Sequence, residues 1–253
     1  MDIASRIVSL LEEEKTFCLA TVIESGDREI KPGNKAIVLE DGSMEGSLGH
    51  ESLDQKLGDL SPTLLKEKKS STIHLEKSVR VFINILSSET KLLICGGGHI
   101  AIPLAQFAQR VGYRVTVLDD RPDFAHPSRF PDCSVIAKDF AEALREMSLD
   151  PSTFVVVITR GHEHDVDCLV EVLKKEAAYV GLIGSRRRVR IVLEVLERTG
   201  IPRERLKSVF TPIGIPIGAE SPEEIALSIV SELVCVRRKG PQQARALRAA
   251  IGI

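Results

Sequence analysis

The stretch LLICGGGHIAIPLAQFA, residues 92–108, decides the fold predicted for this chain. A short apolar run enters three consecutive glycines, and a helical pattern follows them. Gly96, Gly98 and Ala101 have the G-x-G-x-x-A spacing of a dinucleotide-binding turn, in which backbone N–H groups and a helix N-terminus face a phosphate. The same glycines also serve close strand–helix packing in α/β domains that bind no nucleotide, so the surrounding pattern must support the motif.

Short apolar runs alternate with helical patterns on the C-terminal side of this stretch. The runs, taken as strands, are 92–95, 115–118, 134–136, 154–158 and 179–183, with a weaker one at 208–211. The helical patterns lie near 100–111, 139–148, 165–176, 187–199 and 222–238. Strand–helix alternation with continuous apolar strands is typical of a doubly wound parallel sheet. The sequence therefore predicts a Rossmann-like α/β domain at residues 89–253.

The part of the chain before residue 89 has a different pattern and predicts a smaller α+β domain at residues 1–88. Its expected elements are strands at 17–24 and 35–46, a short helix at 51–60 and a β-hairpin at 71–86. The hairpin shows the cleanest alternation, with Val79, Val81 and Ile83 on one face. This pattern indicates an antiparallel sheet, and the polar segment 87–90 is the expected linker.

Composition limits the classes of function. The chain has 253 residues, 43% of them hydrophobic, and a formal net charge of −2. That charge argues against a broad nucleic-acid or membrane surface, and the apolar runs are far shorter than the roughly 20 residues of a membrane span. The first residues carry glutamates where a signal peptide would be apolar. Five scattered cysteines without C-x-x-C spacing favour free thiols in a reducing cytoplasm.

Polar, glycine-rich and basic residues follow the predicted strands, where an open parallel sheet binds its ligands. They are Asp119, Asp120 and Arg121 after the second strand, Thr159, Arg160 and His162 after the fourth, Gly184 to Arg188 after the fifth, and 211–224 after the sixth. Asp119 lies about 20 residues beyond the glycines, where an acid holds the hydroxyls of a ribose without a 2′-phosphate. His99, inside the glycine loop, is either a polar cap of the helix or a ligand contact and proton donor.

Three consecutive arginines, Arg186 to Arg188, begin the predicted helix after the fifth strand. They suit an anionic ligand such as pyrophosphate, although a solvated first turn of a helix would use the same residues. Only one or two of the three side chains can face the ligand, and Arg186 is the favoured one.

A cluster of His162, His164 and Asp165 raises the question of a metal ion. Residues two apart on a helix diverge by about 200 degrees, so the two histidines are poorly placed to share a metal. His162 and Asp165, three apart, share a face and fit either a ligand contact or a helix N-terminus. Because no Cys or Glu completes a set of four ligands, we predict no bound metal ion.

The loops together resemble the XdhC/CoxI family, the xanthine dehydrogenase accessory factors. The motifs that carry the resemblance are GGGHIAIPLA, VLDDRPDFAHPSRFPDC, TRGHEHD, YVGLIGSRRR and PIGIPIGAESPEEIALSI, with ATVIESGD, KPGNKAIVLEDGSMEGSLG and ESLD in the first half. The resemblance implies a protein that binds the molybdenum cofactor as cargo and hands it to a molybdenum hydroxylase such as xanthine dehydrogenase. It further implies a cysteine desulfurase partner that supplies the sulfido ligand. Carried over motif by motif, the cofactor-binding positions are Gly96, Gly98, His99, Ala101, Asp119, Arg121, Thr159, Arg160, His162, Asp165, Ser185 and Arg186.

One motif departs from the family pattern. Many members have glycines and a cysteine after the G-[ST]-L-G segment, whereas here Gly46-Ser47-Leu48-Gly49 runs into His50 with no cysteine. If that cysteine handles sulfur or molybdenum in relatives, this chain lacks the step or uses another thiol. Cys95, next to the glycine loop, is the nearest candidate, and its alternative role is that of a small buried residue ending a strand.

Three hypotheses of function remain open at this stage. A non-catalytic cofactor chaperone explains why no catalytic set such as G-x-S-x-G or H-E-x-x-H is present. A nicotinamide-dependent oxidoreductase would bind NAD and use His99 or His162 as proton donor. A nucleotide-sensing regulatory domain would bind a dinucleotide without chemistry. A homodimer is compatible with apolar faces on the N-terminal domain and the final helix, and fold alone does not separate these hypotheses.

Overall fold

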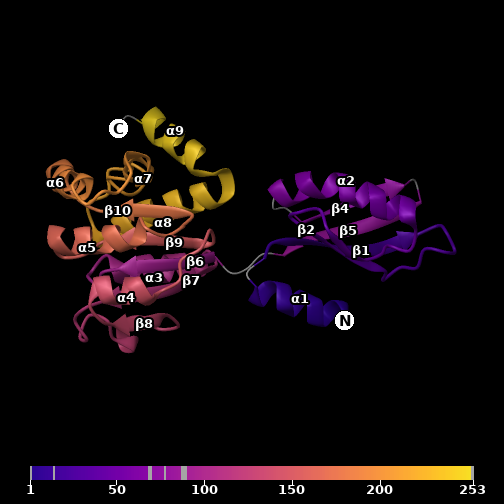
Figure 1. The fold of residues 1–253 in the computed structure, drawn as a ribbon, viewed down its shortest axis with the longest axis horizontal. Helices are drawn as coiled ribbons and strands as arrows, with labels where there is room; N and C mark the ends of the chain where they lie inside the picture. Colours follow the sequence, from indigo (N-terminus) through magenta and orange to yellow (C-terminus); the bar gives the residue numbers. More distant parts are fainter. Residues whose placement is uncertain (1, 14, 68–69, 77, 87–89, 252–253) are drawn as a thin grey trace. The chain divides into compact units, whose positions relative to one another are not determined.

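The computed structural model describes residues 2–13, 15–67, 70–76, 78–86 and 90–251, with the backbone alone for Glu67 and Arg186. Contacts divide the chain into two compact units, Met1–Ser88 and Glu89–Ile253 (Figure 1). The linker expected at 87–90 falls mainly outside the described residues.

The first unit is a five-stranded antiparallel sheet in the order β3-β2-β1-β5-β4, with two helices. Its elements are α1 (Ile3–Glu12), β1 (Phe17–Ser25), β2 (Lys35–Leu39), β3 (Met44–Gly46), α2 (Glu51–Glu67), β4 (Ser71–Glu76) and β5 (Val79–Leu86). Cys18 and Ala20 of β1 pack with Leu53 of α2 in one core, while Phe17 packs with Leu10 of α1 in another. Successive side chains of a strand point to opposite faces of the sheet, so β1 contributes side chains to both cores.

The helix α2 is longer than the sequence predicted. The sequence predicted a short helix at 51–60, and Pro62, which follows, lacks the backbone N–H that a helix interior uses. The structure keeps Pro62 inside α2 and continues to Glu67. Leu65, 6% exposed, belongs to the core beyond the proline, and burying a leucine outweighs one lost hydrogen bond.

The second unit contains a five-stranded parallel sheet in the order β10-β9-β6-β7-β8. The strands are β6 (Thr90–Cys95), β7 (Tyr113–Asp119), β8 (Ser134–Ala137), β9 (Thr153–Val157) and β10 (Tyr179–Leu182). The helices are α3 (Ala101–Arg110), η1 (Pro127–Arg129), α4 (Phe140–Glu146), α5 (His162–Val172), α6 (Arg186–Glu197), α7 (Arg203–Ser208), α8 (Pro222–Lys239) and α9 (Pro241–Ile251). In chain order the sheet runs 5-4-1-2-3, so the predicted Rossmann-like fold is confirmed, and the order switches between β6 and β9.

Helices cover both faces of this sheet (Figure 1). Leu92 and Ile94 of β6 pack in the core formed with α3 and α8, whereas Leu93 and Cys95 pack in the core formed with α4, α5 and α6. Both faces of β6 are therefore buried, which explains its continuous apolar sequence. No helix within the described ranges is long and apolar enough to cross a bilayer.

The weaker sixth strand predicted at 208–211 is reduced to a single paired residue, Phe210. One parallel bridge joins Gly181 to Phe210, and α7 ends just before it at Ser208. Pro212 follows and has no N–H with which to continue a strand ladder. The structure also adds α7 and α9, which the sequence analysis did not predict, and it starts α5 at His162 rather than at residue 165.

Candidate binding site at the carboxyl end of the parallel sheet

The three glycines after β6 have different surroundings. Gly96 has a φ of 115°, and a Cβ there would lie 2.5 Å from the Ile158 carbonyl oxygen. A Cβ on Gly97 would lie 2.7 Å from the Phe124 carbonyl oxygen, whereas a Cβ on Gly98 would have no atom within 4 Å. Gly96 and Gly97 thus serve close packing, and the open backbone at Gly98 is where a ligand can approach. The sequence left open whether these glycines serve close packing or the approach of a phosphate. In the structure, different neighbouring glycines suit the two roles.

Asp119, at the end of β7, holds the glycine loop. Its carboxylate is 1% exposed and accepts a hydrogen bond of 2.7 Å from the Gly97 backbone N–H. Arg121 donates to both carboxylate oxygens, from Nε at 2.8 Å and from Nη2 at 2.9 Å. Burial raises the pKa of Asp119, but the hydrogen bonds from Arg121 and Gly97 outweigh it, and the pKa lies below its ordinary value. Both carboxylate oxygens of Asp119, which were predicted to face a ribose, therefore accept hydrogen bonds from the protein itself.

A second arginine, which the sequence analysis missed, fixes the same loop. Arg129 donates from Nη1 to the carbonyl oxygens of Gly97 and Phe124, both at 2.8 Å. The guanidinium of Arg121 stacks 3.5 Å from the centre of the Phe124 ring. The loop is therefore tied through both the N–H and the C=O of Gly97. Arg129 lies in η1, far from any strand end, so strand-end reasoning could not identify it.

Asp165, in the first turn of α5, is fully buried and paired with Arg188. Arg188 donates from Nε to the carboxylate at 2.7 Å, and its Nη2 donates to the Thr159 carbonyl oxygen at 3.1 Å. The Thr159 hydroxyl donates to the other carboxylate oxygen at 2.6 Å. Burial raises the pKa of Asp165, and the hydrogen bonds from Thr159 and Arg188 offset part of that rise. Thr159, Asp165 and Arg188 thus join the ends of β9, α5 and α6.

Arg188 is one arginine that the structure places at this edge of the sheet. The side chain of Arg186 lies outside the described part of the structure, so its role stays a prediction. Ser185 caps α6, with its hydroxyl accepting from the Arg188 N–H at 3.3 Å. That cap makes Arg188 the third residue of the helix and sends its side chain back over Gly184.

The remaining predicted residues lie at the surface or in the core. Arg160 is paired with Asp120 through both carboxylate oxygens, at 2.5 and 2.8 Å. His99 and His162 are exposed, and Ala101 is fully buried in α3. Here, the carboxyl-end site means Gly96–Gly98, Asp119–Arg121, Thr159, Arg160, Asp165 and Arg188.

Asp165, one of the side chains considered as metal ligands, belongs to this site through its pair with Arg188. The side chains of His164 and Cys95 have other contacts. His164 packs against the Phe140 ring, with centroids 5.4 Å apart. Among the residues that the structure describes, no three His, Cys, Asp or Glu side chains are grouped as metal ligands would be. Cys95 is fully buried at the end of β6, which matches the small-residue role, and its part in sulfur handling stays a prediction.

A buried carboxylate positions the loop between α7 and α8. Glu232 of α8 is fully buried, accepts from the Tyr179 hydroxyl, and accepts from the Gly214 N–H at 3.0 Å. Arg248 of α9 lies 3.2 Å from its second carboxylate oxygen. Burial raises the pKa of Tyr179 well above its ordinary value, so the phenol keeps the proton that it donates. The pattern of α8 predicted a buried face, and it did not predict a charge there.

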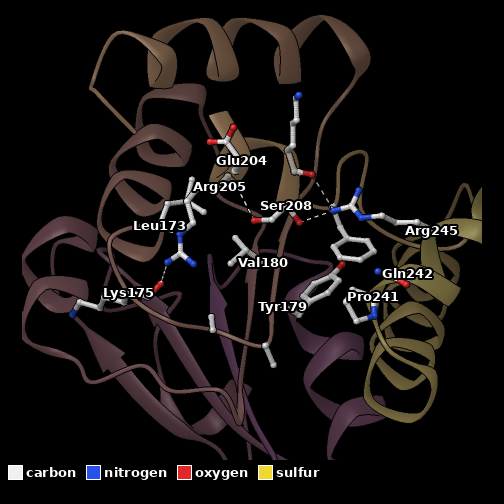
Figure 2. A pocket seen from close by; sticks show the side chains of 14 residues that line it. Leu173, Lys175, Tyr179, Val180, Glu204, Arg205, Ser208, Pro241, Gln242 and Arg245 are labelled. Carbon is white, nitrogen blue, oxygen red and sulfur yellow. Dashed lines mark hydrogen bonds between the residues drawn. The ribbon is translucent and has the colours of Figure 1, made fainter. Parts of the chain in front are cut away.

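A pocket of about 350 Å³ lies at the other end of the sheet (Figure 2). Tyr179, the first residue of β10, lines it together with residues of α7 and α9. Arg245 stacks 4.1 Å from the centre of the Phe210 ring and donates to the carbonyl oxygen of Ser208 at 2.6 Å. Because this pocket is at the amino end of β10, it is separate from the carboxyl-end site.

We expect Gly96→Ala to lower the free energy of unfolding of the Rossmann-like unit by about 2–3 kcal/mol, because it combines a clash with a positive φ. Gly112→Ala, which has a φ of 85° and no atom within 4 Å of its Cβ, isolates the backbone strain and should cost about 1 kcal/mol. Urea unfolding of the full chain measures both. Equal losses in the two variants would contradict the packing role of Gly96.

Comparisons with known proteins identify relatives of both units. A family model of the XdhC Rossmann domain matches residues 92–233, and a model of the XdhC and CoxI family matches residues 10–76. An uncharacterized Escherichia coli protein, YqeB, is 27% identical over 257 residues, covering 95% of this chain and 47% of that protein. A probable xanthine dehydrogenase subunit from Bacillus subtilis is 30% identical over 190 residues, covering 74% of this chain and 54% of that protein. The chain thus spans about half the length of these curated relatives.

A solved structure shares the fold. The crystal structure of a xanthine dehydrogenase from Bacillus halodurans superposes with a TM-score of 0.56 at 22% identity, covering 94% of this chain and 96% of that one. The Rossmann-domain match alone covers more than half of the 253 residues. This chain therefore belongs to the XdhC and CoxI family.

Proposed function

We propose that this chain is an accessory protein of a xanthine dehydrogenase-type molybdenum hydroxylase, and that it binds the molybdenum cofactor as cargo at the carboxyl-end site. In that role it assists sulfuration of the cofactor and its insertion into the client enzyme. The observation that carries the proposal is the open backbone at Gly98, next to the strand-order switch of a Rossmann-like sheet. The pterin cofactor carries a phosphate, which such a loop can accept.

The residues present fit a phosphate group. A Cβ would occupy the space at Gly98, so only glycine leaves the backbone free for close approach. Arg160 has a side chain 39% exposed, and a guanidinium can hold a phosphate through two parallel hydrogen bonds. His99 and His162, both exposed, are available for the rest of the cofactor. The chain's part is binding and shielding, and the bound molybdenum would do its chemistry in the client.

The names of the relatives support the choice of client. The Bacillus subtilis relative is described as a probable xanthine dehydrogenase component, which favours a molybdenum hydroxylase as the partner. A cysteine desulfurase partner, a homodimer and a cytoplasmic location are further proposals. The last has the support of five cysteines that are all free in the structure.

The nicotinamide alternative has weaker support. The acid that would hold the ribose hydroxyls of NAD is Asp119, and Gly97 and Arg121 already donate to both of its oxygens. A dinucleotide would have to break these hydrogen bonds of a buried carboxylate. This conformation therefore favours a ligand held through phosphate rather than through ribose.

Equilibrium dialysis of the full chain tests the proposal. The chain is dialysed against molybdenum cofactor freshly released from a molybdoenzyme, and in parallel against NAD. We expect retention of about one molybdenum per chain, measured by elemental mass spectrometry, and little retention of NAD. Tight binding of NAD with no molybdenum retained would overturn the cofactor role.

A further inference from the structure

The arginines of the carboxyl-end site are already paired with aspartates. Among the described residues the pairs are Arg121 with Asp119 at 2.8 Å, Arg160 with Asp120 at 2.5 Å, and Arg188 with Asp165 at 2.5 Å. The charges of each pair cancel, so an incoming anion meets none of these three guanidiniums free. For an arginine of this set to bind the anion, one pair must open.

Burial decides which pair can open. The carboxylates of Asp119 and Asp165 are 1% and 0% exposed, and removing their arginine would leave a buried, unpaired charge. The Asp120 side chain is 25% exposed and that of Arg160 is 39% exposed. Water can solvate both groups after separation, and such exposed pairs contribute little to stability. Arg160–Asp120 is therefore the exchangeable pair.

The Arg160–Asp120 pair lies at the strand end from which the glycine loop begins. Asp120 directly follows β7, and Arg160 lies shortly after β9. These strands are the two neighbours of β6, so the pair bridges two strand spacings, roughly 10 Å, across the carboxyl end of β6. The glycine loop with its open position at Gly98 leaves that same strand end.

The geometry of the pair resembles that of a bound phosphate. Nη1 and Nη2 of Arg160 each donate to one carboxylate oxygen of Asp120, at 2.5 and 2.8 Å. A guanidinium uses this same two-bond fork on phosphate oxygens. The Asp120 carboxylate thus accepts the two Arg160 N–H hydrogen bonds that a ligand phosphate would otherwise accept.

We propose that Asp120 is a built-in competitor for the anionic group of the ligand, and that a phosphate or pyrophosphate ester displaces it from Arg160 on binding. The inference deepens the proposed function and rests on the ligand carrying phosphate. Binding then includes the opening of the pair, so the closed fraction lowers the apparent affinity. Neutral molecules cannot displace the carboxylate, which gives the site a preference for anionic ligands.

A double-mutant cycle tests the competition, with inorganic pyrophosphate as probe and calorimetry on the full chain. Asp120→Asn should bind pyrophosphate about two- to five-fold tighter, because the competing ion pair is lost. Arg160→Gln should bind it about tenfold or more weakly, because a charge-assisted contact is lost. In the double variant most of the gain from Asp120→Asn should vanish, since Asp120 makes its two short hydrogen bonds with Arg160 and lies 4.0 Å from Arg121.

Matched controls separate this effect from the general change in charge. Arg110→Gln, at the far end of α3, and Glu194→Gln, on α6, change the same charges at exposed positions and should leave the affinity unchanged. Thermal melting of each variant verifies folding.

Three outcomes would overturn the inference. They are an unchanged affinity in Asp120→Asn, a weaker affinity in that variant, and a gain that persists in the Arg160→Gln background. If the wild-type chain retains molybdenum cofactor while the pyrophosphate cycle shows no coupling, the competition fails and the proposed function stands. If the wild-type chain binds neither probe, the proposed function itself fails.

Discussion

Replacing Arg188 by methionine is expected to lower the free energy of unfolding of the Rossmann-like unit by about 3–5 kcal/mol. The Asp165 carboxylate is fully buried and accepts hydrogen bonds from Arg188 and from the Thr159 hydroxyl. The substitution removes the first of these two donors and leaves the second. Methionine keeps much of the apolar stem, so the loss reports the charge rather than the packing. Urea unfolding of the full chain at pH 7, followed by circular dichroism, measures it.

The matched control is Arg190→Met on the same helix. The Arg190 side chain is 74% exposed and lies 3.7 Å from Glu194, so its removal should change stability by no more than about 0.5 kcal/mol. Adding Asp165→Asn to Arg188→Met should restore part of the loss, because it removes the unpaired charge. Equal effects of Arg188→Met and Arg190→Met would contradict the assignment of a buried ion pair.

The pH dependence of the Arg188 variant has a defined sign. Burial already raises the pKa of Asp165 above its ordinary value, and loss of Arg188 raises that pKa further. A carboxyl whose pKa is raised in the folded state binds more protons folded than unfolded, so its contribution to stability is lost as pH rises through the folded pKa. The deficit of Arg188→Met relative to wild type should therefore shrink between pH 7 and pH 5.

Substitution of Gly98 is expected to remove cofactor binding without unfolding the protein. A Cβ at this position meets no atom within 4 Å, and Gly98 is not among the glycines with positive φ. Gly98→Val should thus change the free energy of unfolding by no more than about 1 kcal/mol. The same side chain fills the space through which the loop reaches a phosphate, and we expect affinity for the molybdenum cofactor to fall about 100-fold.

A graded series makes this result specific. Gly98→Ala should give an intermediate loss of affinity, because the smaller side chain blocks less of the approach. Gly58→Ala serves as control, since Gly58 lies in α2 of the other unit and its Cβ would find its nearest atom at 4.0 Å. Retention of molybdenum by Gly98→Val at the wild-type level would exclude this loop as the phosphate site.

Much of the fold could be predicted from the sequence because periodicity is a local property. The strands of the Rossmann-like sheet are continuously apolar because both of their faces are buried. The residues of β5 alternate because one of its faces is buried. The run at 208–211 was apolar enough for a strand, but the structure pairs only its Phe210 with β10, and an apolar run alone does not show how far a pairing extends. The helix predicted at 51–60 likewise continues through Pro62 to Glu67, where the burial of Leu65 supports the extension.

The sequence predicted where the candidate site lies, but it predicted only some of the contacts between the residues there. Residues after the strands do gather, because parallel strands share one carboxyl edge. Arg188 lies there because the cap at Ser185 makes it the third residue of α6, and the sequence pattern did not fix where that helix begins. Asp119 and Arg129 hold the glycine loop through contacts 22 and 32 residues apart in sequence, which no local pattern contains.

Hydrogen–deuterium exchange of the full chain, with and without molybdenum cofactor, tests the central claim most directly. If the cofactor binds at the carboxyl-end site, amides at 96–101 and 159–161 should gain protection, and those around the pocket of Figure 2 at 204–210 and 241–245 should not. Protection confined to 204–210 and 241–245, with unchanged exchange at the glycine loop, would contradict the account.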